Sequence, residues 1–223
     1  VKADHLRQQN QIDEAIALFE EILKEQPMNA RAHGRLGTLL AMKDRREEAV
    51  KHLSMVTECD PDDSYGLGML GWLAYLDNKP AEAIEYLIKA DEIEPYAFTI
   101  HFNIALSYLK MNKLDEARPW LEKACQIQPQ HIESGLIMTG VLLDQKEFEK
   151  AVSRIDDLSS LTQHQSPQVE LTRAEVYQAQ NQPEQAVRIL ELLSEDRSAK
   201  ADPALAQEIR RRLSALRSQI KGR

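Results

Sequence analysis

The chain has 223 residues, of which 43% are hydrophobic, 29% charged and 5% aromatic, with 8 glycines and 9 prolines. This composition is typical of a folded protein and excludes an intrinsically disordered one. The formal net charge of −8 disfavours a general nucleic-acid binder, which gains its affinity by neutralising phosphates, and no run of 18 apolar residues exists that could span a membrane.

Proline and alanine recur at a fixed interval from the N-terminus onward. Each of the first four matching prolines lies 34 residues from the next, namely Pro27, Pro61, Pro95 and Pro129. Alanine keeps the same spacing at Ala15, Ala49, Ala83, Ala117 and Ala151, and Ala186 follows after 35 residues. Two series in phase with each other predict an internal repeat of this length.

Each repeat is predicted to contain two antiparallel helices. In residues 98–131, for example, Ile104 and Tyr108 lie at helical spacing before a polar junction at residues 111–113, and Ala117 and Leu121 lie at helical spacing after it. So short a junction requires close packing, which small residues such as Gly37 and Gly71 permit. Proline near the end of the second helix prevents that helix from continuing.

The repeats are expected in a fixed order along one solenoid over residues 1–223. Residues 1–29 form a partial repeat, followed by repeats at 30–63, 64–97, 98–131, 132–165 and 167–199. The pattern weakens late in the chain, since Gln163 replaces the proline, Ser166-Pro167 marks a one-residue insertion, and Arg173 stands where a core leucine is expected.

A last helix is predicted at residues 203–221, after the N-cap signal Asp202-Pro203. Its apolar stripe indicates a capping helix that covers the end of the stack, and consists of Leu205, Ile209, Leu213, Leu216 and Ile220. Residues 197–223 carry eight basic and two acidic side chains, net +6, whereas the rest carries 20 basic and 34 acidic, net −14. The basic segment is either a solvated helix face or an electrostatic docking site.

These columns resemble the tetratricopeptide repeat (TPR) over about residues 1–199. The match in residues 64–97 consists of Leu70-Gly71, Ala83, Leu87, Ala90 and Pro95. The resemblance implies an all-α fold, a right-handed superhelix (α-solenoid) of antiparallel helix pairs closed by the C-terminal capping helix. It implies no particular activity.

No pattern in the sequence indicates catalysis. Gly66, Gly68 and Gly71 match G-x-G-x-x-G, but they lie inside a predicted helix and not in a strand-to-helix turn. The six histidines include no H-E-x-x-H motif, and Cys59 and Cys125 lie too far apart in the repeat stack for a disulfide. We expect no enzyme activity, cofactor, metal or small-molecule substrate, and two free thiols.

The TPR resemblance implies that the first helix of each repeat lines a concave groove. Several side chains expected on that surface are apolar or aromatic, which is typical of a partner site, although tight winding of the stack would instead bury some of them. The predicted protein-binding residues are Arg31, Arg35, Tyr65, Met69, Trp72, Tyr75, Phe102, Asn103, Leu106, Leu136 and Leu143. The carboxylate clamp by which some TPRs bind acidic chaperone tails is rejected, because only Asn103 matches its pattern.

The sequence thus favours a protein-interaction scaffold that binds an apolar or amphipathic peptide in its groove. The alternative is a structural assembly protein that forms homo-oligomers through its solenoid ends. RNA binding is disfavoured by the acidic body and the apolar groove. We expect a cytoplasmic location, the alternative being a periplasmic or membrane-tethered one through an N-terminal segment that precedes Val1.

Overall fold

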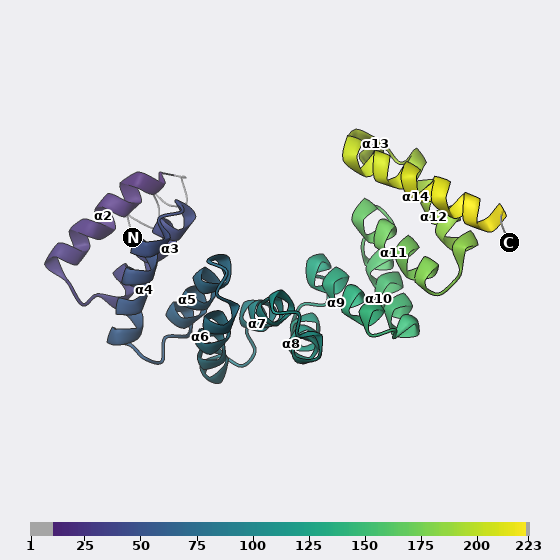
Figure 1. Ribbon diagram of the computed structural model, residues 1–223. Helices are drawn as coiled ribbons and strands as arrows, with labels where there is room; N and C mark the ends of the chain where they lie inside the picture. Colours follow the sequence, from purple (N-terminus) through teal and green to yellow (C-terminus); the bar gives the residue numbers. More distant parts are fainter. Residues whose placement is uncertain (1–10, 222–223) are drawn as a thin grey trace. The chain divides into compact units, whose positions relative to one another are not determined.

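The computed structural model describes residues 11–221, which form helices joined by short turns and contain no strand (Figure 1). Residues 1–10, where the sequence predicts the last part of a first helix in the partial repeat, lie outside the described part. The chain forms two compact units, Val1–Ile127 and Gln128–Arg223.

The first unit consists of helix pairs. Its described helices are α2 (Ile12–Glu25), α3 (Ala30–Met42), α4 (Arg46–Cys59), α5 (Ser64–Leu76), α6 (Pro80–Ile93), α7 (Phe98–Lys110) and α8 (Leu114–Ile127). Helix α3 packs against α4, α5 against α6 and α7 against α8, and α4 and α6 each contact the helix that follows. The predicted all-α architecture of adjacent helix pairs is therefore confirmed.

The second unit continues with the same arrangement and adds two helices at its end. Its described helices are α9 (Ile132–Asp144), α10 (Phe148–Leu161), α11 (Pro167–Ala179), α12 (Pro183–Glu195), α13 (Arg197–Ala201) and α14 (Pro203–Lys221). The short helix α13 was not foreseen; Asp196 caps it by accepting bonds from the backbone of Ser198 and Ala199. The expectation that all repeats form one continuous solenoid stays a prediction.

Glycine allows the two helices of a pair to touch. A Cβ atom added to Gly37 would lie 2.7 Å from Cγ of Leu53, and one added to Gly71 would lie 2.5 Å from Cγ of Leu87. Carbon atoms in a protein interior pack at about 3.5–4.0 Å, so these positions have no room for a side chain. Leu53 and Leu87 are themselves fully buried, and the large side chain of one helix fills the space beside the glycine of the other.

The turn within each helix pair places one residue in the left-handed backbone region. These residues keep the repeat spacing, and their φ angles are 59° at Asp44, 61° at Asn78, 58° at Asn112, 60° at Lys146 and 60° at Asn181. In each turn the following N–H donates to a carbonyl near the end of the first helix, as Lys79 does to Ala74 at 2.9 Å. This pattern ends the helix sharply, and Asn and Asp tolerate the left-handed conformation best after glycine.

The turn between α10 and α11 departs from this regularity. Two consecutive residues, Gln163 and His164, adopt φ angles of 52° and 58°. The turn contains the extra residue predicted from the sequence, and α11 then begins at Pro167. The backbone N–H of His164 donates to the carbonyl of Ser159 at 2.9 Å. The Nδ1 atom of its imidazole lies 2.6 Å from Oγ of Ser159.

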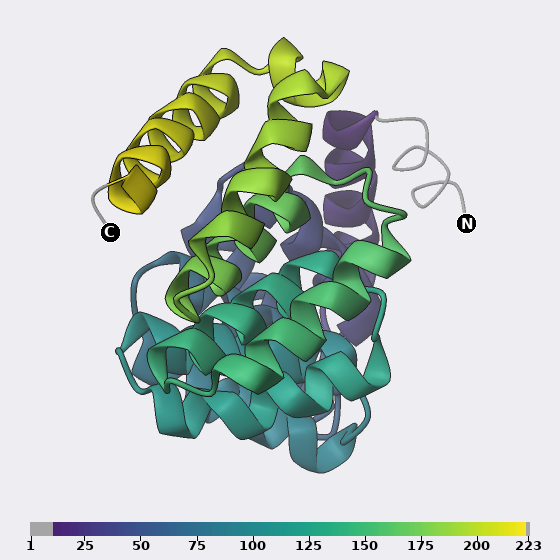
Figure 2. The ribbon, with the colours of Figure 1, turned by 90° about the vertical axis from the view of Figure 1, so that its right-hand side faces the viewer.

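Helix α14 buries its apolar stripe in the second unit. Asp202 accepts bonds from the backbone N–H groups of Ala204 and Leu205 at 3.0 and 3.2 Å, and so caps its first turn. The buried side chains of α14 join a core formed with α11, α12 and α13, and they are Ile209, Leu213 and Leu216. Helix α14, drawn in yellow in Figure 1 and Figure 2, is the predicted capping helix.

Candidate functional site

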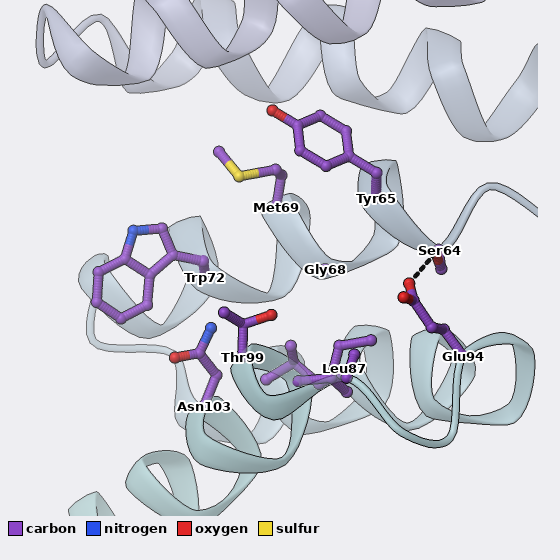
Figure 3. Close-up of a pocket in the computed structure, with 11 residues that line it drawn as sticks. Ser64, Tyr65, Gly68, Met69, Trp72, Leu87, Glu94, Thr99 and Asn103 are labelled. Carbon is purple, nitrogen blue, oxygen red and sulfur yellow. Dashed lines mark hydrogen bonds between the residues drawn. The ribbon is translucent and has the colours of Figure 1, made fainter. Parts of the chain in front are cut away.

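A pocket of about 400 Å³ opens between α5 and α7 in the first unit (Figure 3). Its wall is mainly apolar and carries a few polar groups. The lining residues are Ser64, Tyr65, Gly68, Met69, Trp72, Leu87, Glu94, Ala97, Thr99, Ile100 and Asn103. Apolar pockets with a few placed polar groups are where proteins commonly hold ligands.

Helical spacing brings the α5 residues to the pocket. Tyr65, Met69 and Trp72 are separated by four and three residues, so they lie on one face of the helix. Gly68 lies on the same face, and no heavy atom comes within 4 Å of the point where its Cβ would be. Here glycine leaves open volume, in contrast to Gly71, where it permits packing.

The face of α7 toward the pocket adds polar groups. Thr99 and Asn103 are four residues apart and lie on one helical face, with Ile100 beside them. The Asn103 side-chain amide supplies both donors and an acceptor, as is needed to bind a peptide backbone. Figure 3 shows Asn103 near Trp72, on the wall opposite Met69.

Trp72 forms one end of the pocket and belongs to an aromatic pair. Its ring stacks on that of Tyr75, with centroids 5.4 Å apart and planes inclined by 17°. Lys110 of α7 lies behind this pair, with Nζ 4.4 Å from the centre of the Tyr75 ring and donating to the Tyr75 carbonyl at 2.8 Å. Trp72 is only half-buried, so part of the indole surface faces the pocket.

Hydrogen bonds hold two other lining residues in place. The Tyr65 hydroxyl lies 2.5 Å from Oγ1 of Thr38 on α3, which ties α5 to the preceding pair. Ser64 Oγ donates to Oε2 of Glu94 at 2.9 Å. Figure 3 shows this Ser64–Glu94 pair at the end of the pocket away from Trp72.

Four of the predicted groove residues line this pocket, namely Tyr65, Met69, Trp72 and Asn103. Tyr75 supports it from behind by stacking on Trp72. The others lie elsewhere: exposed Arg31 and half-buried Arg35 belong to α3, half-buried Leu106 to α7, and half-buried Leu136 and Leu143 to α9 of the second unit.

Phe102 departs from the prediction of a groove residue. It is only 8% exposed, and its ring stacks on that of Phe98 with centroids 5.5 Å apart. Its helical position predicted a groove residue, but the side chain is one of those that the packing of the repeats buries, and aromatic stacking on Phe98 adds a contact there. Phe102 does not line the pocket.

The prediction missed the lining residues at the ends of helices. Glu94 follows α6 and Ser64 begins α5, whereas the predicted groove used interior positions of first helices alone. Gly68 and Thr99 occupy groove positions, but neither carries an apolar side chain that would have marked it. The usable signal for Glu94 was a carboxylate just before Pro95, at the turn into the next repeat.

The buried histidines hold helices together. Nδ1 of His33 lies 2.9 Å from Nδ1 of His52, and its Nε2 lies 2.9 Å from the carbonyl oxygen of Pro27. Burial lowers the pKa of His52, and the neighbouring His33 ring lowers it further. His101 takes the same place in α7, where Nε2 lies 2.6 Å from a carboxylate oxygen of Asp91. These contacts give the histidines a structural role.

A second polar cluster surrounds Glu170 in the second unit. The Glu170 carboxylate is buried and accepts a hydrogen bond from Ser159 Oγ, with Nδ1 of His164 at 3.3 Å and the guanidinium of Arg173 at 3.4 Å. Nε of Arg173 also donates to Asp156 at 2.7 Å. Arg173, which replaces a core leucine of the repeat, therefore compensates two carboxylates. Ser159 is fully buried, so the cluster offers no accessible nucleophile.

Between residues 11 and 221, no three His, Cys, Asp or Glu side chains gather closely enough to hold a metal ion. None of the described helices is both long and apolar enough to cross a bilayer. Cys59 and Cys125 are free thiols, as predicted.

Three tetratricopeptide-repeat models match the sequence, at residues 6–73, 98–131 and 167–191. Together with the observed helix pairs, these matches define the class: the chain is a tetratricopeptide-repeat protein. No curated protein sequence matches it.

Solved structures share the fold at low sequence identity. PilF of Pseudomonas aeruginosa is 18% identical with a TM-score of 0.77, and the match covers 93% of each chain. PilW, a type IV pilus biogenesis factor, is 18% identical with a TM-score of 0.77 over 93% of this chain and 94% of that one. YrrB, a TPR protein with an unusual peptide-binding site, is 16% identical with a TM-score of 0.72 over 86% and 97%. At these identities the likeness shows the fold alone.

Proposed function

We propose that this TPR protein is a non-enzymatic interaction scaffold that holds an apolar or amphipathic segment of a partner protein against α5 and α7. The observation that carries the proposal is the pocket itself. Half-exposed Trp72 and Met69 lie beside open volume at Gly68, and the Asn103 amide is within the same pocket. Aromatic and methionine side chains are enriched at the cores of protein interfaces.

The size of the pocket supports a short segment as the ligand. A volume of about 400 Å³ falls near the lower end of ligand pockets, which span about 300–1,000 Å³. It suits a few side chains of an extended or helical segment, and Asn103 and Thr99 could bond to the backbone of an extended one. A peptide-binding site on YrrB provides a precedent within the fold.

Gly68 allows a test that blocks the pocket without touching the core. A Gly68→Leu side chain would project into the open volume, while the fold would gain helix propensity. Gly140 of α9 is the matched control, because it too is a helical glycine with no heavy atom within 4 Å of its Cβ position. Thermal melting of both variants checks that each still folds.

The binding measurement is selection of random dodecapeptides displayed on phage. We expect the wild type and Gly140→Leu proteins to enrich the same peptides, and Gly68→Leu to enrich none of them. A wild type that enriches no peptide beyond the Gly68→Leu background would contradict the proposal. Equal enrichment on Gly68→Leu would also contradict it, because binding would then occur outside the pocket.

A further inference from the structure

The charges around the α5–α7 pocket are unevenly placed. Among its lining residues, Glu94 is the only one that is charged at neutral pH. Glu94 is exposed and accepts one hydrogen bond, from the neutral Ser64 hydroxyl. Within residues 11–221 no lysine, arginine or histidine forms an ion pair with Glu94. Its carboxylate is therefore free to accept a bond from a cation brought by a ligand.

The end of α6 adds to the negative potential at this side of the pocket. Glu94 is the C-cap residue of α6, and the last turn of that helix has no basic side chain. The C-terminus of a helix carries a partial negative charge that favours a nearby cation. In addition, Asp60, Asp62 and Asp63 lie in the turn that leads into Ser64.

The opposite end of the pocket, at Trp72, is apolar and has no carboxylate among its lining residues. Trp72 and Met69 present apolar surface there, and Lys110 already lies over the ring of Tyr75. A second cation near this aromatic pair would be repelled by Lys110, whereas an apolar side chain would cover indole and thioether surface. Figure 3 shows Glu94 and Trp72 at the two ends, with Gly68 between them.

We propose that the pocket recognises a segment in which a lysine or arginine lies next to a large apolar residue. The basic group binds Glu94 beside Ser64, and the apolar side chain packs on Met69 and Trp72. This inference rests on the proposed function and adds the chemistry of the partner. An acidic partner segment, the ligand of the carboxylate-clamp TPRs, would meet Glu94 with a like charge.

The test uses one arginine-containing peptide enriched on the wild type and resynthesised in three forms. The first form retains the arginine, the second has citrulline, its neutral isostere, and the third has glutamate. We expect citrulline to weaken binding to the wild type roughly twofold to fivefold, the range of an exposed ion pair, and glutamate to weaken it more. On Glu94→Gln the arginine and citrulline forms should bind equally, and raised salt should weaken the arginine form on the wild type alone.

The outcomes separate this inference from the proposed function. The inference would be overturned if the enriched peptides lacked a basic residue, or if the preference for arginine persisted on Glu94→Gln. The proposed function would still stand in either case if Gly68→Leu abolished binding. Self-association of the wild type that Gly68→Leu abolishes would put a second copy in the pocket and would overturn the inference. An absence of any enriched peptide on the wild type contradicts both proposals.

Discussion

His52 shows how one side chain couples the fold to pH. Burial lowers its pKa, and the His33 ring, 2.9 Å away between Nδ1 atoms, adds to the effect. The carbonyl of Pro27 can only accept, so Nε2 of His33 carries the proton of that bond and Nδ1 of neutral His33 accepts from His52.

The sign of the resulting pH dependence follows from this lowered pKa. The unfolded chain binds a proton at His52 near the ordinary value of about 6.5, before the folded chain does, so stability falls as the pH drops through about 6.5. We expect the wild type to lose stability between about pH 7.5 and about pH 5.5, and His52→Gln to lose measurably less. The difference should be small because His52 remains partly solvated. Urea unfolding of both proteins at each pH checks this; identical slopes would contradict it.

Gly71 and Gly68 lie three residues apart on α5 and have opposite roles. Alanine at Gly71 would place Cβ 2.5 Å from Cγ of Leu87, a clash that should cost about 1–3 kcal/mol of unfolding free energy. Alanine at Gly68 meets open space and should stabilise by up to about 1 kcal/mol through helix propensity. Chemical denaturation of the two variants measures both, and a neutral Gly71→Ala would show that α5 and α6 are not in close contact.

Helix α14 covers apolar side chains at the end of the second unit. Ile209, Leu213 and Leu216 are buried against a core that includes Leu190 and Leu193. Deleting residues 203–223 would expose this surface to water, and end caps keep repeat arrays soluble. We therefore expect the truncated chain to aggregate or to melt at a lower temperature than the full chain.

A surface variant provides the control for the α14 truncation. Arg210 is exposed, so Arg210→Ala changes the basic face of α14 and leaves the apolar stripe intact. We compare the full chain, the truncated chain and this variant by light scattering and thermal melting. Only the truncated chain should aggregate or melt at a lower temperature. A truncated chain as soluble and stable as the full one would show that α14 is not a cap.

Over the whole molecule, the sequence predicted the repeat and the packing better than the site. The residue types at Gly71, Ala83 and Leu87 recur with the repeat, because a closely packed helix pair needs small residues where the helices touch and a large one beside them. The structure packs these three residues as expected. Tyr65, Met69 and Trp72 could be assigned to one face because helical spacing alone determines it.

The rest of the site depends on contacts that spacing does not encode. Glu94 comes to the pocket from the end of a second helix, through the turn geometry and its bond to Ser64. Phe102 has the helical position of a groove residue but is buried in the packed helices, where its ring stacks on that of Phe98. Arg173 interrupts the repeat for a local reason, the compensation of Glu170 and Asp156.

We propose that α5 and α7 bind a partner segment through Trp72. A fully buried aromatic costs about 3–5 kcal/mol of stability when it is cut to alanine, whereas an interface anchor costs about 2 kcal/mol or more of binding. The most direct test is therefore to compare Trp72→Ala with the wild type in two measurements. Urea unfolding gives the stability of each protein, and titration with a peptide enriched on the wild type gives the dissociation constant of each. We predict a loss of stability well below that of a buried aromatic and a binding loss of about thirtyfold, equivalent to about 2 kcal/mol. Severe destabilisation, or unchanged affinity in a folded variant, would contradict a role of Trp72 as the binding anchor.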